Sequence, residues 1–168
     1  QKGITVLGEN NVYYLPYLMG ERSPHNDTDA RSAFVGMAMD TTREEMTQAV
    51  LEGVSFAIRD CIEAAKAQGI EIKESMLCGG GAKSPLWRKM LANILGITLK
   101  IPQTEQGPSY GGAILAAVSC GDFESVAQCC EKWIAISDVI EPCAELTAKY
   151  ETKYRKWHKL YPALKGSF

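Results

Sequence analysis

The sequence has no apolar run as long as the ~18 residues that a membrane-spanning helix needs. Its first residues also lack the basic segment followed by an apolar segment that a secretory signal would show. The formal net charge of −2 gives no basic excess that would attract nucleic acid or an anionic membrane surface. These absences favour a globular protein of the cytoplasm, and 168 residues suffice for one domain with a substantial core.

Histidine is scarce, and no two cysteines form a C-x-x-C pair. His25 and His158 lie far apart in the sequence with no cysteine at ligand spacing, so no zinc or other metal site is expected. In reducing compartments cysteine usually behaves as a small buried hydrophobe. We therefore predict free thiols, mostly on apolar faces, at Cys61, Cys78, Cys120, Cys129, Cys130 and Cys143.

Three successive glycines separate a short apolar run from a helix start, and the rest of the chain can be placed around this stretch. Residues 76–78 are typical of the end of a buried strand, and residues 79–81 allow positive φ and a close approach to a ligand. Ser84 suits an N-cap and Pro85 the first helical position. The free N–H groups of that helix would face the glycine turn, which could then hold a phosphate or the ribose edge of a nucleotide.

By spacing alone this nucleotide signal is weak. The stretch does not match G-x-G-x-x-G, since Ser84 stands where the last glycine would be, and it does not match G-x-x-x-x-G-K-[ST]. A tight turn between strand and helix that binds no ligand explains the glycines equally well.

A long amphipathic helix is the clearest structural prediction. Thr42 and Glu45 form a capping box, and apolar residues recur every three or four positions until Gly69 ends the pattern. Gly53 inside the helix predicts a close approach by another backbone. The opposite face is predicted to be polar, with Arg43, Glu44, Gln48, Glu52, Arg59, Glu63 and Lys66.

Three strands are predicted before this helix. Residues 4–7 and 12–15 resemble strands joined by a hairpin or loop, and Pro16 should end the second. Residues 33–39 resemble a third, with Gly36 at a bulge or a close backbone contact.

A polar loop at residues 20–31 lies between these strands and could orient a polar ligand. A solvated loop held by Asx turns at Asn26 and Asp27 is the favoured alternative.

The order of elements after the long helix predicts an α/β fold. The remaining pattern comprises a helix at 86–95, a strand at 97–101, a helix at 108–119, a short helix at 123–132 and a long helix from Pro142. Short connections imply parallel strands, with the N-terminal strands as an antiparallel edge of the same sheet. Small residues in 108–119 predict a central helix. The last helix carries a stripe assigned to packing, formed by Leu146, Tyr150, Tyr154, Trp157 and Tyr161.

Four ordered stretches together resemble the C-terminal domain of the FGGY carbohydrate kinases. Residues 32–37 with 45–53 resemble the family's second signature, and residues 79–84 resemble its adenosine motif. Residues 107–113 are similar to its glycine- and alanine-rich helix start. Residues 15–27 resemble the loop of those members that phosphorylate xylulose.

This resemblance implies a ribonuclease-H-like domain of the actin superfamily, one of two that close on a cleft holding MgATP and a sugar. ATP or ADP is the implied cofactor, with Mg²⁺ carried by the nucleotide. The implied nucleotide-binding residues are Gly79, Gly80, Gly81, Ala82 and Ser84. Lys83 could pair with a phosphate, although a lysine at a helix start is more often solvated, and Glu52 is expected to hold its helix in place through hydrogen bonds.

The chain departs from the family in what it lacks. The catalytic aspartate base and most of the sugar site of these kinases precede the matching region, and Asp27, Asp29 and Asp40 give no basis for assigning a base. Phosphoryl transfer needs a positioned base, Mg²⁺ and charge stabilisation. We therefore expect residues 1–168 to be a C-terminal domain without its first strands and inactive alone. Its exposed sheet edges predict a homodimer.

Three functions remain open from the sequence. The leading one is part of an ATP-dependent kinase that, when intact, converts D-xylulose to D-xylulose 5-phosphate. The nearest alternative is another member of the family, acting on gluconate, ribulose or glycerol. The third is a nucleotide-binding module without catalysis. A ligand-free α/β domain would require four coincidental motif matches.

Overall fold

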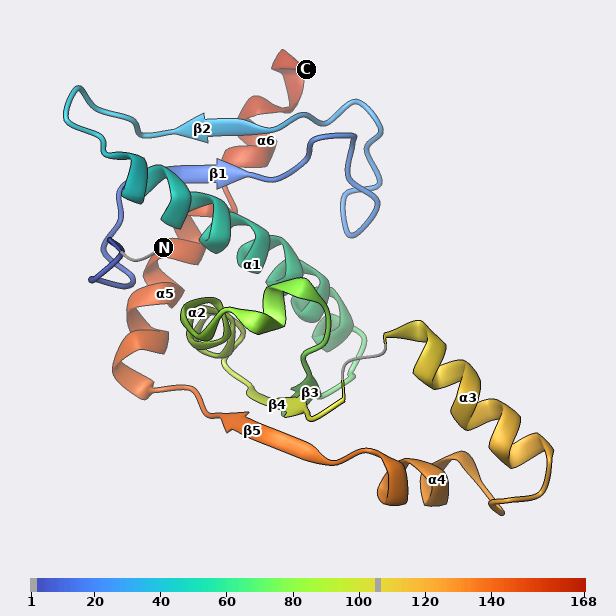
Figure 1. The fold of residues 1–168 in the computed structure, drawn as a ribbon. Coiled ribbons are helices and arrows are strands. Elements are labelled where there is room, and N and C mark those ends of the chain that lie inside the picture. Colours follow the sequence, from blue (N-terminus) through green and yellow to red (C-terminus); the bar gives the residue numbers. More distant parts are fainter. Residues whose placement is uncertain (1–2, 105–106) are drawn as a thin grey trace.

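Two small sheets and one long helix organise the computed structural model, which describes residues 3–104 and 107–168 (Figure 1). The strands are β1 (Tyr13–Leu15), β2 (Ala33–Val35), β3 (Glu74–Met76), β4 (Thr98–Pro102) and β5 (Ile136–Ile140). The α-helices are α1 (Arg43–Ala67), α2 (Pro85–Leu95), α3 (Pro108–Ser119), α4 (Val126–Trp133), α5 (Ala144–Trp157) and α6 (Leu160–Leu164). Two 3₁₀ turns are η1 (Gly80–Lys83) and η2 (Lys165–Ser167). Within the described ranges, no helix is both long and apolar enough to cross a membrane.

The long helix α1 forms where the sequence predicts it. Thr42 Oγ1 accepts a hydrogen bond from Glu45 N at 3.2 Å, and the Glu45 carboxylate accepts one from Thr42 N at 2.8 Å. This reciprocal pair satisfies two amides at the helix start. Gly69 follows the helix with φ of +83°. An added Cβ at Gly53 would collide with the backbone oxygen of Tyr14 in β1, so the predicted close approach is confirmed.

The predicted polar face of α1 is wrong in part, because two of its side chains are buried. Gln48 is 5% exposed and Glu52 is 1% exposed. Glu52 Oε2 accepts a hydrogen bond from Lys153 Nζ of α5 at 2.5 Å, and Oε1 accepts one from Gln48 Nε2 at 2.8 Å. A buried carboxylate is tolerated where it is paired in this way. The prediction that Glu52 holds the helix through hydrogen bonds is confirmed.

β1 and β2 pair antiparallel and form a sheet of their own, so the prediction that they extend the larger sheet is wrong. β1 ends before Pro16, as predicted. Residues 4–7 do not form a strand, so that prediction is wrong, although Ile4 is buried in the core. β2 is shorter than predicted and is followed by Gly36 with φ of +86°. A Cβ at Gly36 would lie 2.6 Å from Asn11 O, which confirms the close backbone contact.

The second sheet has the spatial order β3, β4, β5. β3 runs parallel to β4, as predicted, whereas β5 runs antiparallel to β4 and was not predicted. Along β4, Leu99 and Ile101 are buried and their neighbours are half-buried. β3 is exposed along its length, so the prediction of a buried strand before the glycine turn is wrong. It is an edge strand in the described part of the chain, with a partner on one side.

The main core surrounds α2, which lies between α1, α5 and the three-stranded sheet (Figure 1). Its inner face is buried at Met90, Leu91, Ile94 and Leu95, and the helix lies where the sequence predicts one. The aromatic stripe of the C-terminal helices is also packing surface, because Tyr150, Tyr154, Trp157 and Tyr161 are all buried. Trp157 Nε1 donates a hydrogen bond to Tyr14 O at 2.8 Å and so ties α5 to β1.

α3 has the predicted bounds but not the predicted central position. It projects with α4 away from the main body in Figure 1. Its buried residues are Ile114 and Ala117, whereas Leu115 is 59% exposed. Small side chains permit close packing, but they bury little apolar area and do not drive it. The small residues of α3 therefore did not determine whether the helix lies at the centre or at the edge of the fold.

The prediction that the cysteines lie mostly on apolar faces is also wrong. All six are free thiols, as predicted, but Cys61, Cys78, Cys120 and Cys143 are exposed. Cys129 is fully buried, in the small core between α3 and α4. Whether a cysteine is buried depends on its position in the helix or strand that carries it. The four exposed cysteines lie at helix ends, between elements or on an outward helix face.

Candidate functional site

The glycine turn forms between β3 and α2 and has the predicted helix cap. Gly79 has φ of +93°, the 3₁₀ turn η1 follows, and Ser84 Oγ accepts a hydrogen bond from Trp87 N at 3.2 Å. Pro85 is the first residue of α2. Of the three glycines, Gly79 alone adopts positive φ. Gly80 has open space where a side chain would be, and a side chain at Gly81 would collide with the Trp87 ring.

Two amides of the predicted nucleotide-binding residues are used inside this turn. Ala82 N donates to Gly79 O at 3.0 Å, and Ser84 N donates to Gly81 O at 3.1 Å. Ala82 is also buried, at 4% exposed. Within the turn, Gly79 and Gly80 are therefore the glycines at which a ligand can approach the backbone, since a Cβ added at either would meet no other part of the protein within 4 Å.

A cavity of about 340 Å³ opens beside the turn, at the carboxyl ends of β3 and β4. Met76 and Cys78 line one part of it, and Gly107, Tyr110 and Gly111 at the start of α3 line another. Its walls are mainly apolar, and its size falls in the range of small-molecule sites. The cavity thus lies between the segment that leads into the glycine turn, at Met76 and Cys78, and the helix start at residues 107–113, whereas residues 79–84 do not line it.

Tyr110 and Trp133 form the far wall of this cavity. The Tyr110 hydroxyl donates a hydrogen bond to Trp133 O at 2.8 Å, and the two ring centroids lie 6.2 Å apart. Sequence reasoning missed Trp133, because it belongs to the small helix α4, and its nearness to Tyr110 comes from the packing of α4 on α3.

A smaller, more polar cavity of about 190 Å³ lies beside the turn and includes Ala82, Lys83 and Arg88 in its lining. Arg88 Nε donates a hydrogen bond to Ala82 O, and its guanidinium also contacts the Asp138 carboxylate of β5 at 3.4 Å. Arg88 therefore fixes the turn against the sheet. Lys83 is on the exposed side of the turn.

The polar loop at residues 20–31 is held by its own side chains and backbone. Asp27 Oδ1 accepts hydrogen bonds from Asp29 N at 2.9 Å and Ala30 N at 3.2 Å, which confirms the Asx turn predicted at Asp27. The backbones of Glu21 and Asp27 exchange two hydrogen bonds of 2.7 Å. Asn26 has φ of +49° between them, a conformation that asparagine tolerates well.

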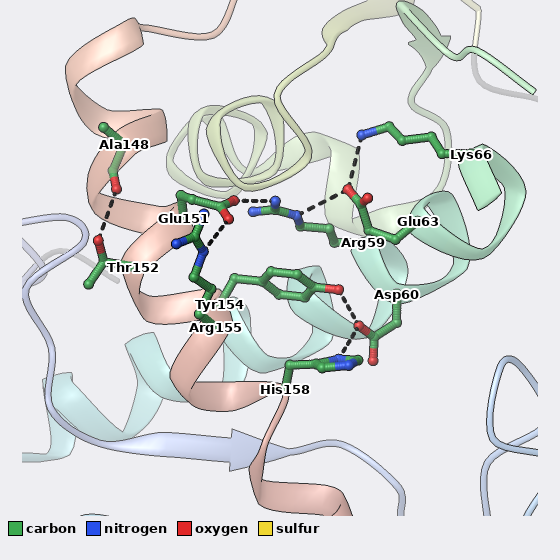
Figure 2. Close-up of polar contacts among 10 residues, drawn as sticks. All are labelled: Arg59, Asp60, Glu63, Lys66, Ala148, Glu151, Thr152, Tyr154, Arg155 and His158. Carbon is green, nitrogen blue, oxygen red and sulfur yellow. Dashed lines mark hydrogen bonds and ion pairs between the residues drawn. The ribbon is translucent and has the colours of Figure 1, made fainter. Parts of the chain in front are cut away.

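A polar cluster between α1 and α5 was not predicted at all (Figure 2). Asp60 is 3% exposed, and its Oδ1 atom accepts a hydrogen bond from the Tyr154 hydroxyl at 2.5 Å. His158 Nδ1 lies 3.0 Å from the same oxygen. Burial, and then the hydrogen bond to Asp60, raises the pKa of Tyr154 far above its usual value, so this hydroxyl keeps its proton. The sequence signal available for this cluster was the i, i+4 spacing of Tyr154 and His158, the C-cap residue of α5, which puts both side chains on one face.

An ion-pair network lies next to this cluster in Figure 2. Arg59 pairs with Glu151, whose other oxygen accepts a hydrogen bond from Arg155 Nε at 2.8 Å. Arg59 also lies over the Tyr154 ring, 4.0 Å from its centroid. Hydrogen bonding by Arg59, the largest influence, lowers the pKa of Glu151. The network joins α1 to α5 at the protein surface.

Within the described residues, no group of three or more His, Cys, Asp or Glu side chains could hold a metal ion. The side chains of the described residues therefore do not form a cation site by themselves. A divalent cation that accompanies phosphates takes much of its coordination from phosphate oxygens and water.

The model of the FGGY family of carbohydrate kinases, C-terminal domain, matches residues 4–120. A xylulose kinase from Staphylococcus epidermidis is 36% identical over 159 residues, which cover 95% of this chain and 32% of that protein. A crystal structure described as a xyloylose kinase from Brucella ovis superposes with a TM-score of 0.89 at 36% identity, covering 99% of this chain and 34% of that one. Gluconate kinase from Lactobacillus acidophilus superposes with a TM-score of 0.84 at 26% identity, covering 95% and 32%.

The chain spans about a third of the length of the curated relatives that it matches. The match includes the glycine turn, the helix start at 107–113 and the polar loop, and the superposition extends over both sheets and the C-terminal helices. The sequence motifs, the family model and the fold all agree, and the chain therefore belongs to the FGGY family of carbohydrate kinases, with the α/β fold of that family's C-terminal domain.

Proposed function

We propose that residues 1–168 are the nucleotide-binding C-terminal domain of an ATP-dependent sugar kinase. The observation that carries this proposal is the apolar cavity of about 340 Å³ between Cys78, which precedes the glycine turn, and Gly107 and Gly111, which begin α3. An apolar cavity beside a backbone turn suits a nucleoside phosphate, whose base needs apolar walls and whose phosphates need N–H groups.

In this proposal the adenine base of ATP or ADP lies in the cavity, and the ribose and phosphates pass over the turn. Gly79 and Gly80 supply the close backbone approach, and Gly81, Ala82 and Ser84 shape the turn. Mg²⁺ would arrive with the phosphates, since the described side chains do not form a site for it.

The chemistry proposed for the intact protein is transfer of the γ-phosphoryl group to a sugar hydroxyl. That step requires a base, charge stabilisation and a held sugar. We assign the base and most of the sugar contacts to a preceding sugar-binding domain, which relatives three times longer have room for. The chain alone is accordingly expected to bind nucleotide without phosphorylating sugar. We place the intact enzyme in the cytoplasm.

D-Xylulose is the proposed sugar, with D-xylulose 5-phosphate as the product. The support is the loop at residues 15–27 and the similarity to proteins named as xylulose kinases. The similarity to a gluconate kinase structure makes gluconate the specific alternative. ADP formation by the intact protein with xylulose, ribulose, gluconate and glycerol decides between them.

The nucleotide site is tested with Gly80→Val, because Gly80 has open space and the added side chain would fill the ligand's path without a clash in the fold. We expect loss of ADP binding in calorimetry. Gly166→Val is the matched control, since Gly166 also has open space and lies in η2, away from the cavity. Equal ADP affinity of the wild type and Gly80→Val would contradict the proposed site.

A homodimer is also proposed, because β3 exposes an edge strand. Light scattering measures the mass directly, and a monodisperse monomer would refute the dimer.

A further inference from the structure

Asp60 is a buried carboxylate where α1, α5 and the polar loop meet. Its side chain is 1% exposed. One oxygen, Oδ1, accepts the hydrogen bond from Tyr154 and contacts His158 Nδ1. The other oxygen, Oδ2, has no hydrogen-bond partner and lies 3.7 Å from His25 Nε2 in the loop. Buried polar atoms are normally paired, so an unpaired buried carboxylate oxygen that faces an equally buried ring nitrogen needs an explanation.

His25 is held in place from three sides. Its ring stacks on that of Tyr161 of α6, with centroids 4.0 Å apart, and meets the edge of Tyr17 at 5.8 Å. Its backbone N–H donates to Glu21 Oε2 at 2.7 Å. Because a carboxylate can only accept hydrogen bonds, a bond between Asp60 Oδ2 and His25 Nε2 requires the proton on Nε2. Small closure of the 3.7 Å gap would complete a charge-assisted hydrogen bond.

The same tyrosine holds the loop at a second point. The Tyr161 hydroxyl donates to Asp27 Oδ2 at 2.5 Å, and Lys165 Nζ lies 3.6 Å from that oxygen. The loop is thus attached to the C-terminal helices at His25 and at Asp27, while a third contact joins Cys61 Sγ to Ser23 O at 3.1 Å. Of these anchors, the contact with Asp60 reaches deepest into the fold.

We propose that Asp60 is a positioning residue of the kinase, which acts through His25 to fix the loop at residues 20–31 against the sugar. This inference rests on the proposed function. Anchored in this way, the loop leaves Arg22, Ser23 and Asn26 exposed. A guanidinium, a hydroxyl and an amide are groups that hydrogen-bond the hydroxyls of a polyol or ketose. A loop anchored at Ser23, His25 and Asp27 presents these groups without the entropy cost of ordering on binding.

The neighbouring ion pair supplies a control for a purely structural role. Arg59 precedes Asp60 on α1, and its partner Glu151 lies on α5 (Figure 2). Glu151→Gln therefore weakens the joint between the same two helices without touching the loop.

The experiment uses the intact protein and the variants His25→Phe, Asp60→Asn and their double variant. Phenylalanine keeps the stack on Tyr161 and removes the ring nitrogen. Asparagine keeps the shape of Asp60 but removes its negative charge, so the charge-assisted contact with His25 is lost. We expect each single variant to raise KM for the sugar about tenfold with KM for ATP unchanged. The double variant should be no worse than the more severe single one, because both changes remove one interaction.

Hydrogen exchange of residues 20–31 provides a readout that needs no activity. Both single variants should accelerate exchange there, and Glu151→Gln should leave exchange in the loop and KM for the sugar unchanged. Additive effects of His25→Phe and Asp60→Asn on KM, or an equal rise in KM for ATP, would overturn the positioning role. Absence of kinase activity in the wild type with every sugar would overturn the proposed function, and with it the role toward sugar, whereas exchange would still show whether Asp60 anchors the loop.

Discussion

The ring of Trp87 fills the space that a side chain at Gly81 would need. Trp87 is itself fixed, because its Nε1 lies 3.0 Å from Ser55 Oγ and 3.2 Å from Leu51 O, both on α1. One aromatic side chain thus sets the glycine turn against the long helix. Gly81 is required for this contact and not for a positive φ, whereas Gly79 is required for its φ of +93°.

Gly81→Ala is expected to destabilise the fold and to weaken nucleotide binding, because the methyl group forces Trp87 or the turn to move. Overpacking of this kind costs about 1–3 kcal/mol of unfolding free energy. Urea denaturation and ADP calorimetry on the intact protein measure the two effects.

Gly80→Ala is the matched control for this prediction. The neighbouring glycine has open space at its Cβ position, and its φ is not positive, so alanine fits there. An unfolding free energy equal to or above that of the wild type is expected for Gly80→Ala, because alanine restricts the unfolded chain more than glycine does. Equal stability of Gly81→Ala would contradict the packing argument.

The helix starts of this fold were predictable from neighbouring residues, whereas the tertiary partners of buried polar side chains were not. The capping box at Thr42 and Glu45 and the N-cap at Ser84 depend on neighbours three residues away, and all formed as predicted. Gln48 and Glu52 were placed on a polar face, because nothing near them in the sequence reveals that Lys153 lies opposite. A charged side chain can be buried where a partner of opposite charge pairs with it, and the partner of Glu52 is 101 residues away in the sequence.

In the candidate site, too, local features were predictable and tertiary contacts were not. The glycine turn could be located from its residues, yet the cavity beside it needs α3 and Trp133, which reach it only through tertiary packing. The contact between Asp60 and His25 joins residues that no local pattern connects. β5 was missed because Ile136 to Ile140 is short and mixes apolar residues with Ser137 and Asp138.

Lys153→Met is expected to cost about 3–5 kcal/mol of unfolding free energy, because it leaves the buried Glu52 carboxylate without its cation. Burial, the larger effect, lowers the pKa of Lys153, and Glu52 acts in the opposite direction. Replacing both partners, with Glu52→Gln and Lys153→Met together, should recover part of the loss. Chemical denaturation of the wild type and these two variants tests this, and a double variant less stable than Lys153→Met would contradict it.

Low pH should weaken the ion-pair contact between α1 and α5, because it protonates the Glu151 carboxylate. Its pKa is lowered in the folded state, chiefly by Arg59, so the unfolded chain binds the proton more tightly. The resulting stabilisation is complete above the unfolded value of 4.5 and is lost as pH falls through the folded pKa. It should stay below about 1 kcal/mol, because the Glu151 side chain is 36% exposed.

Urea unfolding of the wild type and Glu151→Gln between about pH 3 and about pH 7 follows this effect. The wild type should be the more stable near neutral pH, and the two curves should converge toward the acid end. A stability difference that does not change with pH would show that the Glu151 charge is not its source.

Gly111 and Gly112 provide a sharp test of where the nucleotide lies. They are adjacent in α3, and both have open space at the Cβ position, but Gly111 lines the cavity of about 340 Å³. Valine at either position changes helix propensity equally, so a difference between the two variants reports the cavity. We expect Gly111→Val to weaken ADP binding about tenfold or more, because its methyl groups occupy the volume assigned to the base. Gly112→Val should bind ADP as the wild type does, and calorimetry that finds the same affinity for both variants would place the nucleotide outside this cavity.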